Sequence, residues 1–264
     1  MHHHLVMRFS VYMNPYAGDM GRNQFSNMWY THVISKGATS REENLKLYKE
    51  YLYGEERMSV KFSAFENLFL PSLLKNTESR DNWTLYIYVT ESHMPSLYVQ
   101  RLRSLVSGIR NIKIVNLRSE PYDDAEYLNH LESNLSKSDD WSIVWLGDDD
   151  AMCPSHLDLV ESEAEKRSDP FVYTLPRLQR VTLDADGTIV QGKIWECPNV
   201  HGLALTGVRV NPIRLGAHYN IEKNNPDLLV IKNYDVLGGL LYCNKQHTAS
   251  RRDLEGRHFS TKSR

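Results

Sequence analysis

The sequence lacks long apolar runs and is poor in cysteine. No run of about 18 apolar residues occurs, so no membrane-spanning helix is predicted. The three cysteines, Cys153, Cys197 and Cys243, are odd in number and have no CxxC spacing. This excludes a disulfide scaffold, disfavours a zinc knuckle and is typical of reduced, buried thiols in a cytosolic protein. Because no apolar leader of the signal-peptide kind follows Met1, we predict a cytoplasmic location.

An excess of basic residues is also missing. The chain has 31 Lys and Arg against 33 Asp and Glu, and its formal net charge is -2. Proteins that bind nucleic acid usually carry a basic surface, so we expect no nucleic-acid partner. A phosphate-bearing ligand would instead have to be held by a local site, such as a bound metal ion, rather than by a broad positive field.

The common phosphate-binding loops are absent as well. No Gly-rich fingerprint follows the first expected strand at 8–13. A near match to a P-loop at 187–193 lacks the final Ser or Thr, and it lies in an expected hairpin rather than between a strand and a helix. A nucleotide bound by this chain would therefore depend on a metal ion for its phosphates.

What the sequence does contain is typical of one large α/β domain. Hydrophobic residues make up 41% and charged residues 24%, close to the globular norm. Alternating strand and helix patterns from residue 83 to 146 predict a parallel, Rossmann-type sheet with crossover helices. Pro71 is expected to interrupt or kink a helix at 63–74. The other expected helices lie at 41–53, 95–106, 123–135 and 155–167, and the other expected strands at 28–34, 83–89, 112–117 and 141–146.

The pattern changes after 171–174. Asp186-Gly187 lies between two alternating runs, which predicts a hairpin, and one further strand is expected at 228–231. We therefore expect a single domain over 1–264, with a nucleotide-sugar-binding half at about 7–152 and an irregular acceptor half at about 153–250. His2, His3 and His4 look like a tag or leader, so 1–6 are expected to be a loose end, as are 251–264.

The most informative motif is a cluster of acids after an apolar strand. Asp148, Asp149 and Asp150 directly follow the run at 141–146. Adjacent carboxylates repel one another unless a cation lies among them, and their oxygens suit Mg²⁺ or Mn²⁺. Ligands of open α/β sheets bind at the carboxyl ends of strands. The cluster therefore predicts a metal site for a nucleotide diphosphate or for phosphate-ester hydrolysis; the alternative is a solvated turn that caps the next helix.

Several segments together resemble one known family. They are Arg8-Phe9-Ser10, FSAFENLFLPSL at 62–73, NWTLYIYVTE at 82–91 with Met94-Pro95, and LGDDDA at 146–151. Over roughly 8–160 the chain resembles the rhamnosyltransferase family of GT-A-fold glycosyltransferases. It departs from the Arg-Leu-Asp-Asp-Asp-like lead-in of that family, because Trp145-Leu146-Gly147 precede the acids here. The resemblance implies a GT-A-like mixed sheet with flanking helices.

The resemblance also implies an activity and a set of site residues. The chain would move a sugar such as rhamnose from a nucleoside-diphosphate sugar to a hydroxyl of a glycan or other acceptor, using Mn²⁺ or Mg²⁺. Asp150 would be the main metal ligand, Asp148 would contact the metal or the donor ribose, and Asp149 would support them. Arg8 and Ser10 would contact the base and ribose of the donor. A late histidine would complete the metal shell, with His247 the first choice and His201 its alternative.

An inverting transferase needs a base beside the acceptor hydroxyl, and we expect it in the second half of the chain. Asp235 is the first choice because it follows the late strand; the alternatives are Asp227, Glu196 and Glu222. Two other functions remain open. A nucleotidyltransferase would be expected to carry a Gly-rich, Lys-containing N-terminal loop, which the sequence lacks. A non-enzymatic sugar-nucleotide-binding module is disfavoured by the intact Asp148 and Asp150.

Overall fold

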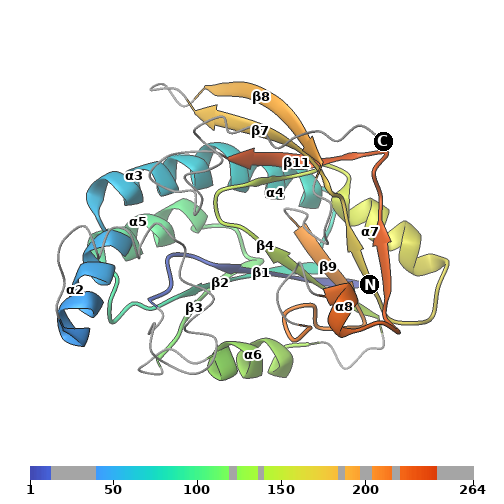
Figure 1. The fold of residues 1–264 in the computed structure, drawn as a ribbon, viewed down its shortest axis with the longest axis horizontal. Helices are drawn as coiled ribbons and strands as arrows, with labels where there is room; N and C mark the ends of the chain where they lie inside the picture. The colour runs from blue at the N-terminus through green and yellow to red at the C-terminus, as the bar shows by residue number, and fades with distance from the viewer. Residues whose placement is uncertain are drawn as a thin grey trace.

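The main sheet has seven strands in the order β10-β6-β9-β4-β1-β2-β3 (Figure 1). The computed structural model describes residues 1–12, 40–118, 124–135, 140–183, 188–196, 204–215 and 221–242. The strands of this sheet are β1 (His2–Arg8), β2 (Trp83–Val89), β3 (Ile112–Asn116), β4 (Trp141–Leu146), β6 (Phe171–Thr174), β9 (Ala204–Val208) and β10 (Leu229–Lys232).

The pairing confirms the predicted GT-A-like, Rossmann-type mixed sheet. β1 lies between β2 and β4 and is parallel to both, and β2 is parallel to β3. β9 is antiparallel to β4 and β6, which makes the sheet mixed. The carboxyl ends of β1, β2 and β4 therefore meet at one edge, where a ligand of an open α/β sheet is expected to bind.

The prediction of a loose end at 1–6 is wrong, because these residues form most of the central strand β1. His3 binds Ser142 Oγ at 2.7 Å through Nδ1 and Glu161 Oε1 at 3.0 Å through Nε2, so its polar ring is satisfied inside the protein. Burial, followed by the charge of His2, lowers the pKa of His4 to about 4, so this buried ring is neutral near pH 7. The first strand, expected at 8–13, forms at His2–Arg8 instead.

Helices cover both faces of the main sheet (Figure 1). One face of β1 and β2 packs with α3 and α5 around Met7, Phe62 and Val99, while the other packs with α6 around Val6 and Tyr127. This alternation follows from the period of two along a strand. The helices are α2 (Arg41–Leu52), α3 (Glu55–Ala64), α4 (Leu70–Thr77), α5 (Ser96–Val106), α6 (Asp124–Ser133), α7 (His156–Glu165) and α8 (Ile221–Asn224).

The helix expected at 63–74 is part of a longer helical segment that runs from Glu55 to Thr77. Its regular geometry is interrupted at η2, a π-helical turn over Phe65–Phe69, in which the N–H of Leu70 bonds to the carbonyl of Phe65. Pro71 follows at the start of α4, and because it has no N–H it cannot donate the bond that a regular helix would make to residue 67. The predicted interruption is therefore confirmed, and it takes the form of a π turn before the proline.

A second sheet of four strands lies above α3 and α4 in Figure 1, in the order β5-β11-β7-β8. Its strands are β5 (Ala151–Met152), β7 (Arg177–Leu183), β8 (Ile189–Glu196) and β11 (Leu237–Tyr242). β7 and β8 pair antiparallel, as the hairpin pattern predicts, although the Asp186-Gly187 turn itself lies outside the described residues. The strand expected at 28–34 and the tail at 251–264 also lie outside them.

Within the described part of the chain, no helix is both long enough and apolar enough to cross a bilayer.

Candidate functional site

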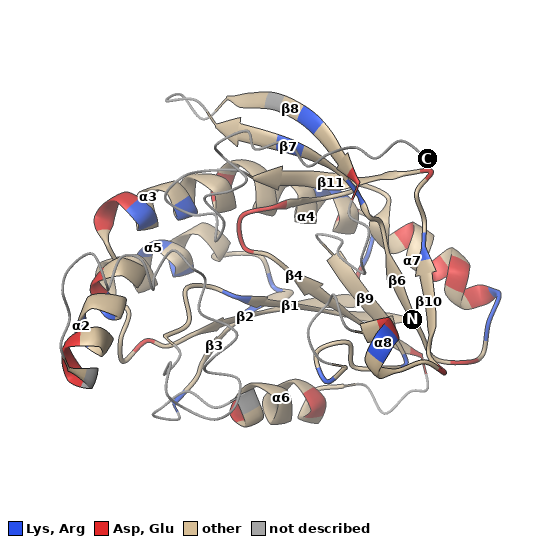
Figure 2. Cartoon of the chain, viewed as in Figure 1, with Lys and Arg blue, Asp and Glu red and all other residues tan. Residues whose placement is uncertain are grey.

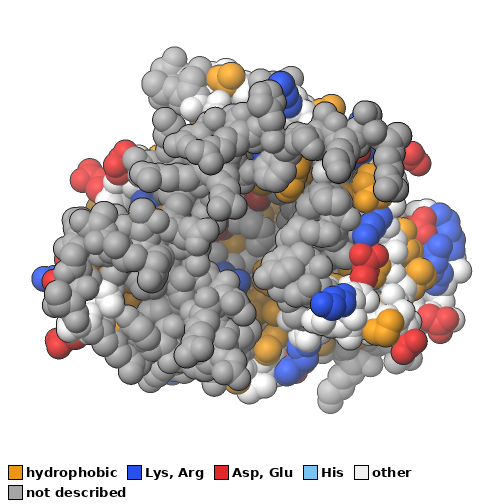
Figure 3. Space-filling model, viewed as in Figure 1, with side chains coloured by type: hydrophobic (Ala, Val, Ile, Leu, Met, Phe, Trp, Pro, Cys, Tyr) orange, Lys and Arg blue, Asp and Glu red, His pale blue; other side chains and the backbone are white. Residues whose placement is uncertain are grey.

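The acid loop, defined as Gly147 to Asp150, joins the two sheets. It leaves β4 of the main sheet and continues directly into β5 of the second sheet. Figure 2 shows it as a red segment between β4 and β11, and Figure 3 shows a hollow near the middle of the same face. The three carboxylates therefore lie at the junction of the sheets, at the carboxyl end of a central strand.

The register of the main sheet brings Arg8 to the acid loop. Met7 of β1 is paired with Leu146 of β4, so Arg8, the last residue of β1, lies at the edge where Gly147 leaves the sheet. The guanidinium of Arg8 lies 5.8 Å from the centre of the Trp145 ring, within cation–π range. The register thus places Arg8 next to the start of the acid loop, and its contact with the donor stays a prediction.

Asp150 is held toward β11. Its Oδ1 accepts the backbone N–H of Tyr242 at 2.9 Å. A Cβ on Gly147 would lie 2.9 Å from Asp150 Oδ2 and 3.3 Å from Asp149 Oδ1, so the backbone of the loop passes close to both carboxylates. Burial, and then the charge of Asp149, raises the pKa of the Asp150 carboxyl well above its usual range.

Asp148 is held toward α3 by a buried lysine that the sequence analysis missed. Lys61 Nζ forms an ion pair with Asp148 Oδ2, and the two residues are 3% and 6% exposed. Burial lowers the pKa of the Lys61 ammonium, and the Asp148 carboxylate opposes that shift. A signal was present in the sequence: Lys61 shares the apolar face of α3 with Met58 and Phe62, and a lysine on such a face needs a partner.

Residues at the junction of α2 and α3 fix the loop after β1. Arg57 donates to Ser10 Oγ at 3.1 Å, and the hydroxyl of Tyr53 donates to the Ser10 carbonyl at 3.0 Å. Tyr53 also contacts Thr90 Oγ1, which in turn accepts the backbone N–H of Tyr12 at 2.9 Å. Ser10 itself is 5% exposed and adopts a φ of 48°. Its hydroxyl is thus engaged with α3, and its predicted contact with the ribose stays a prediction.

Helix α4 supports the exit of the acid loop. Ser72 Oγ accepts the N–H of Met152 at 3.1 Å, and Asn76 Nδ2 donates to the carbonyl of Cys153 at 2.7 Å. The same Asn76 side chain accepts the N–H of Leu157 at 3.4 Å, at the start of α7. Cys153 is a buried free thiol, as predicted. The Leu-Pro-Ser-Leu segment therefore holds the chain that follows the carboxylates.

We predict that Asn76→Ala lowers the free energy of unfolding by about 1–3 kcal/mol, because it removes two buried hydrogen bonds: the one to the Cys153 carbonyl, which then keeps only the His156 N–H as a donor, and the one from the Leu157 N–H. Urea unfolding followed by circular dichroism measures the loss. Asn67→Ala is the matched control, because Asn67 is exposed and donates only within its own helical segment. That change should stay within about 0.5 kcal/mol of wild type. Equal losses in the two variants would contradict the role given to Asn76.

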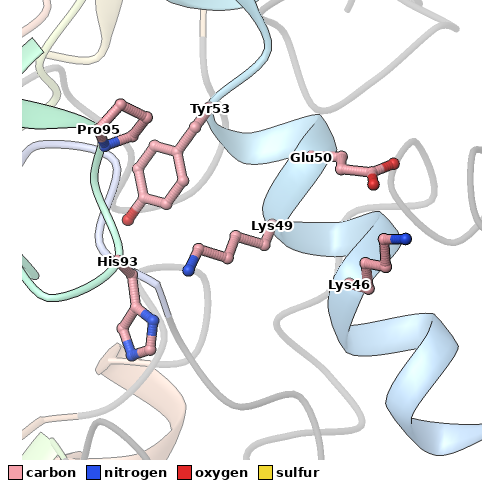
Figure 4. A pocket seen from close by; sticks show the side chains of 6 residues that line it. All are labelled: Lys46, Lys49, Glu50, Tyr53, His93 and Pro95. Atoms are coloured by element: carbon pink, nitrogen blue, oxygen red, sulfur yellow. The ribbon is translucent and has the colours of Figure 1, made fainter. Parts of the chain in front are cut away.

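A pocket of about 300 Å³ lies at the ends of β1 and β2 (Figure 4). The ring of Tyr12 lies 4.3 Å from that of His93 beside it. In Figure 4 the Lys49 amine points toward His93, while Lys46 and Glu50 point away. The lining residues are Lys46, Lys49, Glu50, Tyr53, His93 and Pro95. Tyr53 connects this pocket to the loop after β1.

The four candidate bases lie at other places in the fold. Asp235 is exposed in the turn before β11. Tyr242, whose N–H bonds to Asp150 of the acid loop, lies at the other end of β11, and the five residue steps from Leu237 to Tyr242 span about 16 Å. Asp227 is exposed in the turn before β10. Glu196 forms an ion pair with Arg177 Nε at 3.4 Å, and Glu222 one with Lys232 at 2.6 Å. The role of a base stays a prediction from the sequence.

The predicted histidine ligands, His247 and His201, lie outside the described residues. Among the residues that the structure does describe, no three His, Cys, Asp or Glu side chains form a ready metal-binding group. A cation at the acid loop would therefore need ligands beyond these described side chains, from a bound substrate, from water or from the predicted histidine.

A family model described as "Putative rhamnosyl transferase" matches residues 23–177. No curated protein sequence matches the chain.

Three similar solved structures are distant in sequence. TarS 1–349 from S. aureus has a TM-score of 0.41 and 7% identity, over 92% of this chain and 60% of its own. A "putative nucleotide-diphospho-sugar transferase" from Desulfovibrio desulfuricans has a TM-score of 0.33 and 9% identity, over 89% and 81%. A "Putative Glucose-1-Phosphate Thymidylyltransferase" from Bacillus anthracis has 0.40 and 11%, over 90% and 87%. The chain thus spans less than two thirds of the TarS fragment.

Proposed function

The chain belongs to the rhamnosyl transferase family, because the family model matches more than half of the chain. On that premise we propose that the protein carries out a metal-dependent, inverting transfer of a sugar such as rhamnose. The donor would be a nucleoside-diphosphate sugar and the acceptor a hydroxyl group of a glycan or other molecule. One observation supports this most: the acid loop leaves a central strand of the sheet beside Arg8, at the junction of the two sheets.

The carboxylates fit Mn²⁺ or Mg²⁺, which take hard oxygen ligands. Three acids are adjacent in the loop, and the buried ammonium of Lys61 forms its ion pair with one of them, Asp148. The pKa of Asp150 is raised because burial and the neighbouring acids outweigh the Tyr242 N–H and the Lys61 charge, which both act in the other direction. Asp150 and Asp149 would hold the cation, with diphosphate oxygens and water as further ligands. When bound, the cation supplies charge that stabilises the departing diphosphate.

The residues of the chain would bind and orient the donor. Arg8 provides a positive charge at the edge where the acid loop leaves the sheet. The pocket beside Tyr53 and His93 offers aromatic faces and the Lys49 amine, which suit the base and the phosphates of one nucleotide. An inverting reaction also needs a base at the acceptor, for which Asp235 remains the first candidate.

We predict that a nucleoside diphosphate binds at least about tenfold more weakly in EDTA than with Mn²⁺, because no phosphate-binding loop replaces the cation. A thermal-shift screen of the common nucleoside diphosphates would find the tightest ligand, and calorimetry with that ligand would measure the difference. Returning Mn²⁺ in excess over EDTA should restore the affinity. Unchanged affinity in EDTA would contradict the metal dependence.

Turnover separates this proposal from the alternative of nucleotidyl transfer. A glycosyltransferase with Mn²⁺ releases nucleoside diphosphate from a sugar nucleotide, whereas a nucleotidyltransferase acting on the same donor with pyrophosphate releases nucleoside triphosphate. Chromatography of the products distinguishes the two. Formation of triphosphate, with no diphosphate released, would overturn the proposal.

A further inference from the structure

Helix α3 contacts both of the loops that leave the central strands. Arg57 and Lys61 lie four residues apart, which places them on one face of the helix. Arg57 contacts Ser10 in the loop after β1, and Lys61 contacts Asp148 in the acid loop. One helix face therefore sets the position of two segments that are far apart in the sequence.

The ammonium of Lys61 is fixed on more than one side. It pairs with Asp148, and it also lies 5.2 Å from the centre of the Phe9 ring, within cation–π range. Both partners of the ion pair are buried, so neither charge can be left alone without a large desolvation penalty. The pair is thus unlike an exposed salt bridge, which contributes little.

Asp148 and Asp150 are held by different parts of the fold. Asp148 is drawn toward α3 by Lys61, whereas Asp150 accepts the Tyr242 N–H from β11. Alternation along an extended chain would place these two carboxylates on the same side, where they could share one cation. Their separate partners instead give the two acids different surroundings.

We propose that Lys61 is a positioning residue: it holds the Asp148 carboxylate against α3, so that a divalent cation is bound by Asp149 and Asp150 and not by Asp148. This inference rests on the proposed function, because it concerns the same cation. The geometry agrees with it. Asp148 is already paired with the buried ammonium of Lys61, whereas a Cβ on Gly147 would lie 3.3 Å from Asp149 Oδ1 and 2.9 Å from Asp150 Oδ2, so the latter two carboxylates flank the same short stretch of backbone.

The decisive variant is the double substitution Lys61→Met with Asp148→Asn. It replaces a neutral ion pair by a neutral pair of similar size, and so it keeps the net charge of the loop and avoids a lone buried charge. Mn²⁺ alone is titrated into the protein, and free Mn²⁺ is followed by electron paramagnetic resonance. We expect an affinity within about threefold of wild type. A loss of tenfold or more in the folded double variant would show that Asp148 is a ligand and overturn the inference.

Two single variants test the same assignment from the other side. Lys61→Met frees the Asp148 carboxylate, so Mn²⁺ affinity without donor should rise about tenfold or more, because an opposite charge at contact distance has been removed. Lys61→Arg keeps the charge and should restore the wild-type affinity. Lys75→Met is the matched control, since Lys75 forms an exposed pair with Glu78 and should leave the affinity unchanged. A Lys61→Met protein that folds and shows wild-type affinity contradicts the proposal.

Failure of this inference is distinguishable from failure of the proposed function. Donor turnover with Mn²⁺ decides the function and is measured on the wild-type protein. Mn²⁺ affinity in the double variant decides the role of Lys61. If the wild type turns over donor but the double variant loses Mn²⁺ binding, the proposed function holds and the inference about Lys61 fails. A wild-type protein that binds no Mn²⁺ by itself overturns the inference as well.

Discussion

Asp150→Asn is expected to lower sugar transfer by about 10³-fold or more while the protein remains folded. The amide keeps the size of the side chain and can still accept the Tyr242 N–H, but it removes a charge that the cation needs. A metal ion contributes several kcal/mol to the stabilisation of a leaving group, and each 1.36 kcal/mol is tenfold in rate. Steady-state release of nucleoside diphosphate measures the loss.

Asp169→Asn is the control for this substitution, because Asp169 is exposed and lies after α7. It should leave transfer within about twofold of wild type, since surface substitutions away from a site have small effects. Near-normal transfer by a folded Asp150→Asn protein would return the acid loop to the role of a helix-capping turn.

The stability of Asp150→Asn should also depend on pH in a different way from that of the wild type. Burial raises the pKa of Asp150 in the folded state above its unfolded value, so the protonated carboxyl favours the folded protein. That contribution is fully present below the unfolded-state pKa, near 3.9, and is lost as the pH rises through the folded-state pKa. Without a cation, the wild type should therefore lose stability over this range, and Asp150→Asn should lose less.

Gly147→Ala is expected to lower transfer by about 10²-fold with little change in stability. The added methyl would lie 2.9 Å from Asp150 Oδ2, closer than side-chain carbons normally approach, while the Tyr242 N–H restrains the same carboxylate. The carboxylate must shift, and misplacement by about 1 Å can cost 10²-fold in rate. Gly147 has no positive φ, so the backbone itself accepts alanine.

Gly108→Ala provides the opposite pattern. Gly108 has a φ of 85° in the turn after α5, and an added methyl there meets nothing within 4 Å. This substitution should lower stability by about 1–2 kcal/mol through backbone strain but leave transfer unchanged. Thermal unfolding and donor turnover, measured on both variants, separate the two effects. Wild-type transfer by Gly147→Ala would show that the position of Asp150 is not critical.

The sequence by itself determined the main strands and the place of the acid loop. The runs at 83–89 and 141–146 are rich in aromatic and β-branched residues because both of their faces are covered, and they form β2 and β4 as predicted. The acids follow the β4 run almost directly in the sequence, so their place at the end of a buried strand could be predicted as well. The alternation on either side of Asp186-Gly187 likewise predicted the pairing of β7 with β8.

Other features were decided only by the tertiary structure. Three consecutive histidines have the composition of a tag, and only their pairing between β2 and β4, with Ser142 and Glu161 as partners of His3, makes them a central strand. The ion pair of Lys61 with Asp148 joins α3 to the acid loop, and Asn76 joins α4 to the chain that follows it. Local periodicity shows which residues are buried. Sheet register and helix packing then decide which of the distant residues meet, and that is why the partners of the acid loop could not be derived from the sequence.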